Sequence, residues 1–220
     1  METDDRKTLA VFGATGRTGK HIVSQALNDG YAVHAFVRNL AKLSKQQEAD
    51  HDRLHPVQGD VTNEDDVGDA VAGSDVVLSA LGHAEGAPDD VQTVGTQHML
   101  NAMAKHDVRR IVSETGAGVS HPDDEEHWGA RIMSGMLKLF QPAVLEDAEN
   151  HADALQQSDR DWIIVRAPRL TNGEHTGTYR TGYLKMGPTA SISRADVAHF
   201  MLRLATGGDE YVREMPMICY

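Results

Sequence analysis

The sequence predicts an α/β protein in which a doubly wound parallel sheet is flanked by helices. Short apolar segments recur at intervals long enough for a helix, which is typical of right-handed βαβ crossovers. A glycine-rich turn directly follows the first of these segments and opens an amphipathic one. The chain of 220 residues is 40% hydrophobic, which suits one globular domain spanning residues 1–220.

The predicted strands are short and rich in apolar or β-branched residues, as strands buried on both faces of a parallel sheet are. A last edge strand is predicted in Met215–Tyr220. The other predicted strands are Thr8–Phe12, Ala32–Val37, Leu54–Gln58, Asp75–Ser79, Arg110–Ser113 and Trp162–Arg166.

Helices are predicted where apolar residues recur on one face. Three such segments are Arg17–Asn28, Glu64–Val71, which Gly73 ends, and Ala143–Gln157. A further helix begins at Ser193, a good N-cap, with Asp196 in its first turns against the helix dipole. The long loop before it leads us to expect a small substrate-facing region around residues 167–190.

The chain is acidic, with 33 Asp and Glu against 21 Lys and Arg, a formal net charge of -12. An acidic surface repels nucleic-acid phosphates, so no nucleic-acid partner is expected. The acids include 21 Asp, while Lys occurs 7 times, a composition that favours hydration in concentrated salt. A halophilic source is therefore one hypothesis, and an ordinary acidic bacterial enzyme is the other.

Several classes of protein are disfavoured. No apolar run approaches the roughly 20 residues of a membrane span, and the polar Met1–Lys7 segment is no signal peptide, so a cytoplasmic protein with no membrane partner is expected. The single Cys219 excludes a disulfide framework. The 12 histidines lack metal-ligand spacing, so no metal site is expected.

The strongest motif is the glycine loop, which follows the first predicted strand. Gly13 permits a tight turn, Gly16 lets the backbone approach a pyrophosphate, and Gly19 allows close helix packing, while the helix N-terminus offers free amides. A simple tight turn is the alternative, but the strand before and the helix after favour nucleotide binding. The loop reads Gly13, Ala14, Thr15, Gly16, Arg17, Thr18, Gly19.

The end of the second predicted strand indicates which dinucleotide binds. An acidic residue there would bind the ribose hydroxyls of NAD, but this chain has Arg38, whose guanidinium suits a 2′-phosphate. Arg17 and Lys42 add positive charge. We therefore predict NADP(H) as the cofactor. A solvated surface arginine is the alternative.

Two more strand ends should face the same crevice. Asp60 is expected to bind the adenine amino group, with Val61 packing on the ring, although Asp60 could equally cap the next helix. The small residues Ala80 and Gly82, which flank Leu81, leave room for the cofactor ribose and phosphates.

These motifs together resemble the atypical short-chain dehydrogenase/reductases, most closely the biliverdin-IXβ reductase/flavin reductase group, with the NmrA-like proteins as relatives. The resemblance runs from about Leu9 to the C-terminus. It implies a Rossmann-like fold, NADPH, and hydride delivery to a planar acceptor such as a flavin. The other segments that carry it are Val37-Arg38-Asn39, Gly59-Asp60-Val61, Ser79-Ala80-Leu81-Gly82, Trp162 to Leu170, Thr176 to Tyr179, and Ser193 to Leu202.

The chain departs from that group at two places. Gly116 stands where the group has Ser, and Arg169 where it has His. The Tyr-x-x-x-Lys pair of typical family members is also missing, because the residues four places after Tyr31, Tyr179, Tyr183 and Tyr211 are Ala35, Tyr183, Gly187 and Met215. These departures disfavour biliverdin turnover and carbonyl reduction, whereas flavin reduction needs mainly the alignment of two rings.

Three residues are candidates for catalysis. Thr115 could hold the nicotinamide amide or a substrate oxygen, Arg169 could pair with an anionic group, and His83 could supply a proton. The alternatives are a turn cap, a surface ion pair and a solvated loop residue, respectively. Pro168 and Asn39 are expected to line the cofactor site.

The helix residues Glu146, Asp147 and Glu149 are interpreted as a solvated charged face. Two functions other than reduction stay open: a non-catalytic NADP(H) sensor like the NmrA-type regulators, and a sugar-nucleotide epimerase-like enzyme. The expected assembly is a monomer or weak homodimer, with a small-molecule acceptor as the partner.

Overall fold

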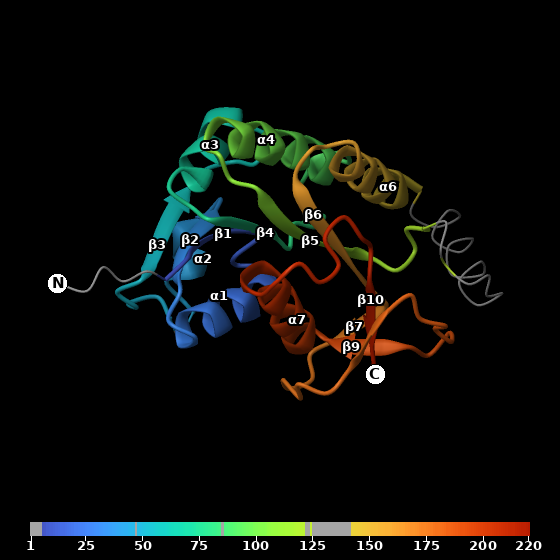
Figure 1. Ribbon diagram of the computed structural model, residues 1–220. Coiled ribbons are helices and arrows are strands. Elements are labelled where there is room, and N and C mark those ends of the chain that lie inside the picture. The colour runs from blue at the N-terminus through green and yellow to red at the C-terminus, as the bar shows by residue number, and fades with distance from the viewer. Residues whose placement is uncertain (1–5, 47, 85, 122–123, 125–141) are drawn as a thin grey trace.

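The computed structural model describes residues 6–46, 48–84, 86–121, 124 and 142–220. The N-terminal segment for which no signal peptide is predicted lies mostly outside these ranges. An eight-stranded sheet runs through the described part, with α1 and α7 on one side and α3, α4 and α6 on the other (Figure 1). The predicted doubly wound, Rossmann-like α/β fold is confirmed.

The four predicted helices are present, and the described residues also form α2 and α4, which were not predicted individually. The helix expected to begin at Arg17 begins two residues later, at Gly19. The helices are α1 (Gly19–Asn28), α2 (Leu40–Leu43), α3 (Glu64–Val71), α4 (Val91–Lys105), α6 (Pro142–Gln156) and α7 (Arg194–Thr206).

The order of the strands in the main sheet is β3-β2-β1-β4-β5-β6-β10-β8. Chain order therefore reverses between β1 and β4, which pair in parallel, and this reversal creates a crevice at their carboxyl ends. The strands are β1 (Thr8–Phe12), β2 (Ala32–Val37), β3 (Leu54–Gln58), β4 (Val76–Ser79), β5 (Arg110–Gly116), β6 (Asp161–Ala167), β8 (Arg180–Gly182) and β10 (Met217–Cys219).

The tail of the chain corrects one prediction. The strand expected at the sheet edge lies inside the sheet, because β8 pairs with β10 in antiparallel fashion and takes the edge. The sheet is thus mostly parallel rather than wholly parallel. Two further strands, β7 (Arg169–Thr171) and β9 (Ser191–Ser193), form a separate pair. The long loop predicted between β6 and α7 therefore contains regular structure.

Alternating side chains of the central strands build a core on each side of the sheet. In β1, Leu9 and Val11 pack with α1 and α7, whereas Ala10 and Phe12 pack with α3 and α4. All of these side chains are fully buried. Burial on both faces explains the nearly continuous apolar strands in the sequence.

Two helix starts are fixed by side chains. Asn63 caps α3 by accepting from the amides of Asp65 and Asp66, so Asp60 does not cap this helix. Ser193 caps α7 as predicted, accepting from the Asp196 amide at 3.0 Å. Asp196 itself is fully buried and also accepts from Thr176 and Tyr220.

A buried histidine joins α4, β5 and α6. The Nδ1 atom of His151 lies 2.7 Å from the Thr96 hydroxyl, and its Nε2 atom lies 3.2 Å from that of Ser113. Burial lowers the pKa of His151 to about 4, although the charge of Asp147 acts in the opposite direction. His151 is therefore neutral in the folded protein at neutral pH.

We expect this histidine to make the protein sensitive to mild acid. Between pH 6.5 and 4 the unfolded chain binds a proton at His151 that the folded chain does not, so the free energy of unfolding falls as the pH falls, by roughly 3 kcal/mol in total. Urea unfolding of wild type and His151→Gln across this range measures the effect. The pH dependence should shrink in His151→Gln but persist in His55→Gln, which alters an exposed histidine of β3. Equal pH dependence in all three proteins would contradict the prediction.

Candidate cofactor and active site

The glycine loop lies at the crevice between β1 and β4 and connects β1 to α1. Gly13 has a φ of +75°, and a Cβ at this position would lie 2.5 Å from the carbonyl oxygen of Ala80. A Cβ at Gly19 would overlap the carbonyl oxygen of Gly13. The amide of Gly16 donates to that same oxygen at 2.8 Å, closing the turn. Glycine is therefore required at both ends of the loop.

The start of α1 offers amides to a ligand. Among the residues that the structure describes, the amides of Arg17, Thr18 and Gly19 donate to no protein acceptor. Thr18 stands at the N-cap position, but its side chain makes no capping hydrogen bond. Free amides at a helix N-terminus bind anions. Together with the closely approached glycines, they fit the pyrophosphate of a dinucleotide.

Positive charge lies beside this loop. Arg38 follows β2 directly and is exposed, as are Arg17 in the loop and Lys42 in α2. Asn39 accepts from the amide of Ala41 at 2.9 Å and so caps α2. This cap fixes the chain directly after Arg38, and a role of Asn39 in binding the cofactor stays a prediction.

The end of β3 places a carboxylate near Arg38. Hydrogen bonds from the amide and hydroxyl of Thr62 lower the pKa of Asp60, and the charge of Arg38 lowers it further. Asp60 is therefore ionised and exposed at the crevice. Val61, next to it, is buried against Gly95 of α4.

The end of β4 forms the other wall of the crevice. Ala80 lies against Gly13, as the close approach of its carbonyl to Gly13 shows, and Gly82 is exposed. Leu81 packs against Gly95 of α4 beside Val61. The structure thus brings the predicted residues of β1, β3 and β4 to one edge of the sheet.

The ends of β5 and β6 lie side by side. Thr115 pairs in register with Arg166, and Gly116 with Ala167. The Thr115 hydroxyl is buried and has no hydrogen-bond partner among the described residues. A buried hydroxyl without a partner is costly, so a ligand that reaches it would gain a hydrogen bond. It does not cap a turn.

The chain after β6 turns outward. Pro168 is buried, whereas Arg169 is exposed at the start of β7. An exposed guanidinium directly after a buried proline is free to meet an anionic ligand. The structure leaves this role of Arg169 as a prediction.

His83 is held by protein groups rather than solvated. Its Nε2 atom lies 3.0 Å from the carbonyl oxygen of Asp89 and 3.2 Å from Asp147, and its Nδ1 atom lies 3.3 Å from the side chain of Gln92. Proton delivery by His83 would require one of these contacts to open. The catalytic role of His83 stays a prediction.

Asp147 corrects the prediction of a solvated charged face on α6. Glu146 is exposed, but Asp147 is only 3% exposed. Its carboxylate accepts from the amides of Gln92 and Thr93 and from the Thr93 hydroxyl. It therefore caps α4 from a neighbouring helix and also anchors His83. These partners lie 54 and 55 residues away, so helical spacing could not reveal them.

A buried ion pair fixes the loop that follows β5. Arg166 is fully buried and forms two hydrogen bonds of 2.6 Å with Asp124. It also donates to the carbonyl oxygens of Val119 and Met215. The charged end of an otherwise apolar strand is the sequence signal for such an anchor, because a buried arginine needs partners.

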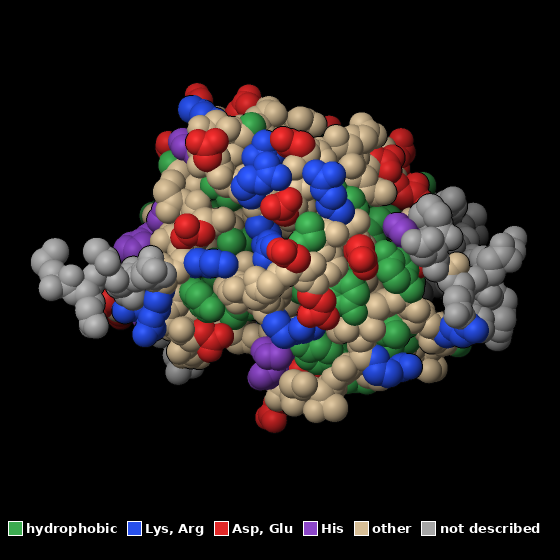
Figure 2. Space-filling view, in the orientation of Figure 1, with side chains coloured by type: hydrophobic (Ala, Val, Ile, Leu, Met, Phe, Trp, Pro, Cys, Tyr) green, Lys and Arg blue, Asp and Glu red, His purple; other side chains and the backbone are tan. Residues whose placement is uncertain are grey.

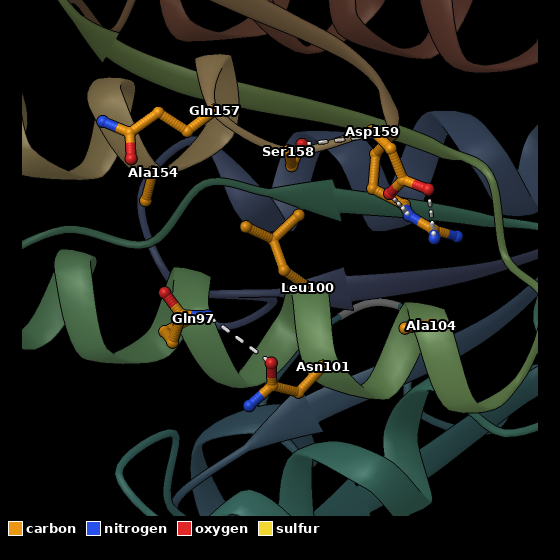
Figure 3. Close-up of a pocket in the computed structure, with 9 residues that line it drawn as sticks. Gln97, Leu100, Asn101, Ala104, Ala154, Gln157, Ser158 and Asp159 are labelled. Carbon is orange, nitrogen blue, oxygen red and sulfur yellow. Dashed lines mark hydrogen bonds and ion pairs between the residues drawn. The ribbon is translucent and has the colours of Figure 1, made fainter.

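A groove of about 270 Å³ lies between α4 and α6, away from these residues (Figure 3). The groove is lined by residues near the carboxyl-terminal ends of α4 and α6 and in the turn after α6, among them Leu100, Asn101 and Ser158. The glycine loop instead follows the carboxyl end of β1, where α1 begins. The groove is therefore separate from the cofactor crevice.

On the face seen in Figure 2, Lys and Arg side chains are interspersed with Asp and Glu side chains. In the described part of the chain, no helix has the length and apolar character needed to cross a membrane. The described residues also contain no group of three or more His, Cys, Asp or Glu side chains placed to hold a metal ion.

Comparison with known proteins agrees with this geometry. An uncharacterised chloroplastic protein of Arabidopsis thaliana is 38% identical over 178 residues, which cover 78% of this chain and 62% of that protein. A short-chain dehydrogenase/reductase of Veillonella parvula, solved with NADP, has a TM-score of 0.77 at 17% identity, covering 96% of this chain and 94% of the other. The anaerobillin reductase ChuY of Escherichia coli O157:H7 has a TM-score of 0.77 at 19% identity and covers 96% of both chains.

The model of the NAD(P)H-binding family matches residues 13–207, which begin at the first glycine of the loop and end just after α7. The match covers the glycine loop and the ends of β3, β4, β5 and β6. The chain therefore belongs to the NAD(P)H-binding family.

Proposed function

We propose that the protein is an NADPH-dependent reductase that passes hydride to a planar acceptor such as a flavin. The observation that carries the proposal is the combination of a glycine loop open to pyrophosphate with Arg38 at the end of β2. The NADP-bound relative and the anaerobillin reductase support a reductase of this kind. The missing Tyr-x-x-x-Lys pair favours an acceptor that needs no phenol for proton transfer.

The cofactor side of the site can be divided by function. The free amides at the start of α1 bind the pyrophosphate, and the positive helix end adds attraction. Arg38 pairs with the 2′-phosphate, with Arg17 and Lys42 adding charge. Asp60, ionised at the same edge, accepts from the adenine amino group.

The acceptor side lies over the ends of β5 and β6. Bound NADPH would supply the hydride. The buried Thr115 hydroxyl holds the nicotinamide amide or an acceptor oxygen, which satisfies a group that otherwise has no described partner. Pro168 lines the pocket and Arg169 pairs with an anionic group of the acceptor. The site needs mainly to align two rings and exclude water.

The first test is NADPH oxidation, followed by absorbance with and without added flavin, with NADH in parallel and at low and multimolar salt. Flavin-dependent oxidation that prefers NADPH supports the proposal, and a requirement for high salt supports the halophilic hypothesis. Tight NADPH binding without turnover favours the sensor instead. A protein that binds neither cofactor contradicts the proposed site.

The choice of NADPH over NADH depends on Arg38. We expect Arg38→Ala to raise the KM for NADPH by about 10- to 100-fold, because a charge-assisted hydrogen bond to the 2′-phosphate is lost. The KM for NADH should change little, since NADH lacks that phosphate. Lys105→Ala removes an exposed charge at the far end of α4 and should leave both values unchanged. An equal effect of Arg38→Ala on both cofactors would contradict the assignment.

A further inference from the structure

A carboxyl group that the sequence does not single out lies directly behind the glycine loop. In β5, Val112 packs in the core shared with α1 and α7. Glu114 comes two residues later and therefore faces the same side of the sheet. Thr115, the next residue, faces the opposite side. Glu114 therefore lies between the sheet and the helix that starts at the cofactor loop.

The contact to the loop is direct. The Thr18 hydroxyl donates to Oε1 of Glu114 at 3.4 Å. Thr18 is the N-cap residue of α1, and its amide is one of those available for the pyrophosphate. A charge on Glu114 therefore lies close to the place where the negative charge of the cofactor arrives.

The charged groups around Glu114 act in opposite directions. Burial raises the pKa of Glu114 to about 7, although the Thr18 hydrogen bond and the charge of Arg194 at the start of α7 lower it. Burial is the main cause that lowers the pKa of the Arg194 guanidinium, and the positive charge of nearby Arg17 lowers it further. From α1, His21 also faces Arg194, and its pKa is lowered first by burial and then by Lys20 and Arg194. Glu48 also acts on His21 and raises its pKa, whereas Glu114 is the acid that acts on Arg194.

We propose that Glu114 takes up a proton from solvent when NADP(H) binds, so that cofactor affinity falls as the pH rises. The inference rests on the proposed cofactor site. The arriving pyrophosphate repels an ionised Glu114, and protonation removes that repulsion while the Thr18 contact is kept. Because the complex binds the proton more tightly than the free protein, binding is favoured at low pH and weakens once the pH exceeds about 7.

The experiment measures the Kd of NADPH by fluorescence from pH 6.5 to 8.5. In this range the 2′-phosphate, whose second pKa is near 6, is mostly ionised and contributes little. We expect the Kd of the wild type to rise by about tenfold over the range. Glu114→Gln keeps an acceptor for Thr18 but cannot ionise, so its Kd should stay nearly constant and match that of the wild type at low pH.

A second measurement counts the protons directly. Calorimetric titration with NADPH at pH 7.5, in buffers of different ionisation enthalpy, reports the number of protons taken up. Uptake is expected in the wild type and in Glu146→Gln, which alters an exposed acid of α6, and should largely vanish in Glu114→Gln.

Two results would overturn the inference. The first is equal pH dependence of Kd in the wild type and in Glu114→Gln. The second is an absence of proton uptake by the wild type. In both cases NADPH still binds, and the proposed function stands. If NADPH binds at no pH, the proposed cofactor site fails together with this inference.

Discussion

Gly19→Ala is expected to abolish measurable NADPH binding. A Cβ at this position would overlap the carbonyl oxygen of Gly13 and come within 3.1 Å of the Cα of Ala14. Both contacts are to backbone, so no side chain can move aside, and the loop itself must shift. Its free amides would then no longer converge on the pyrophosphate. We expect the Kd for NADPH to rise by at least about 100-fold.

The matched control is Gly68→Ala in α3. A Cβ there would meet nothing within 4 Å, and alanine is the better helix former. This variant should bind NADPH as the wild type does and should unfold at the same or a higher temperature. Titration of NADPH fluorescence and thermal unfolding of both variants provide the comparison. Normal binding by Gly19→Ala would show that the loop does not hold the cofactor.

Asp124→Asn is expected to destabilise the protein strongly. Arg166 is fully buried, and the substitution leaves its charge without a carboxylate. Removing one partner of a buried ion pair costs about 3–5 kcal/mol, and the lower end applies because Asp124 is 23% exposed and water can partly replace it. Burial opposes ionisation of Asp124, but hydrogen bonds from Arg166 and His121 lower its pKa, so the pair is ionised at neutral pH.

The control is the same substitution in an exposed pair. Asp209, 90% exposed, pairs with Arg110, and Asp209→Asn should change the free energy of unfolding little. Urea denaturation at pH 7.5 measures both. A second variant is Arg166→Met. The double variant Asp124→Asn/Arg166→Met should lose less free energy of unfolding than the two single variants lose in sum, because both changes remove the same interaction. Strict additivity would show that the pair is not coupled.

The buried pair also bears on the site. Arg166 neighbours Thr115 across the β5–β6 ladder, and its partner Asp124 comes after the end of β5 at Gly116. Loss of the pair should therefore loosen the loop next to the proposed acceptor site. The sequence placed Arg166 at the end of a strand, but nothing in it named Asp124 as its partner.

Local signals were enough for much of this protein. Apolar runs such as Ala32–Val37 predicted their strands to the residue, because a strand buried on both faces leaves a continuous apolar segment. The glycine loop could be predicted because a strand, a tight turn and a helix start are consecutive in the chain. Ser193 could be predicted as an N-cap for the same reason.

The tertiary structure alone decided how distant segments meet. Asp147 reads as part of a solvated helix face, yet it caps α4 and holds His83, and Glu114 reads as one acid among many, yet it lies behind the cofactor loop. The position of β10 inside the sheet depended on β8, a three-residue strand in a segment without apolar periodicity. Periodicity reports which face of an element is buried. It does not report which distant element covers that face, and the charge and partners of a buried polar side chain depend on that packing.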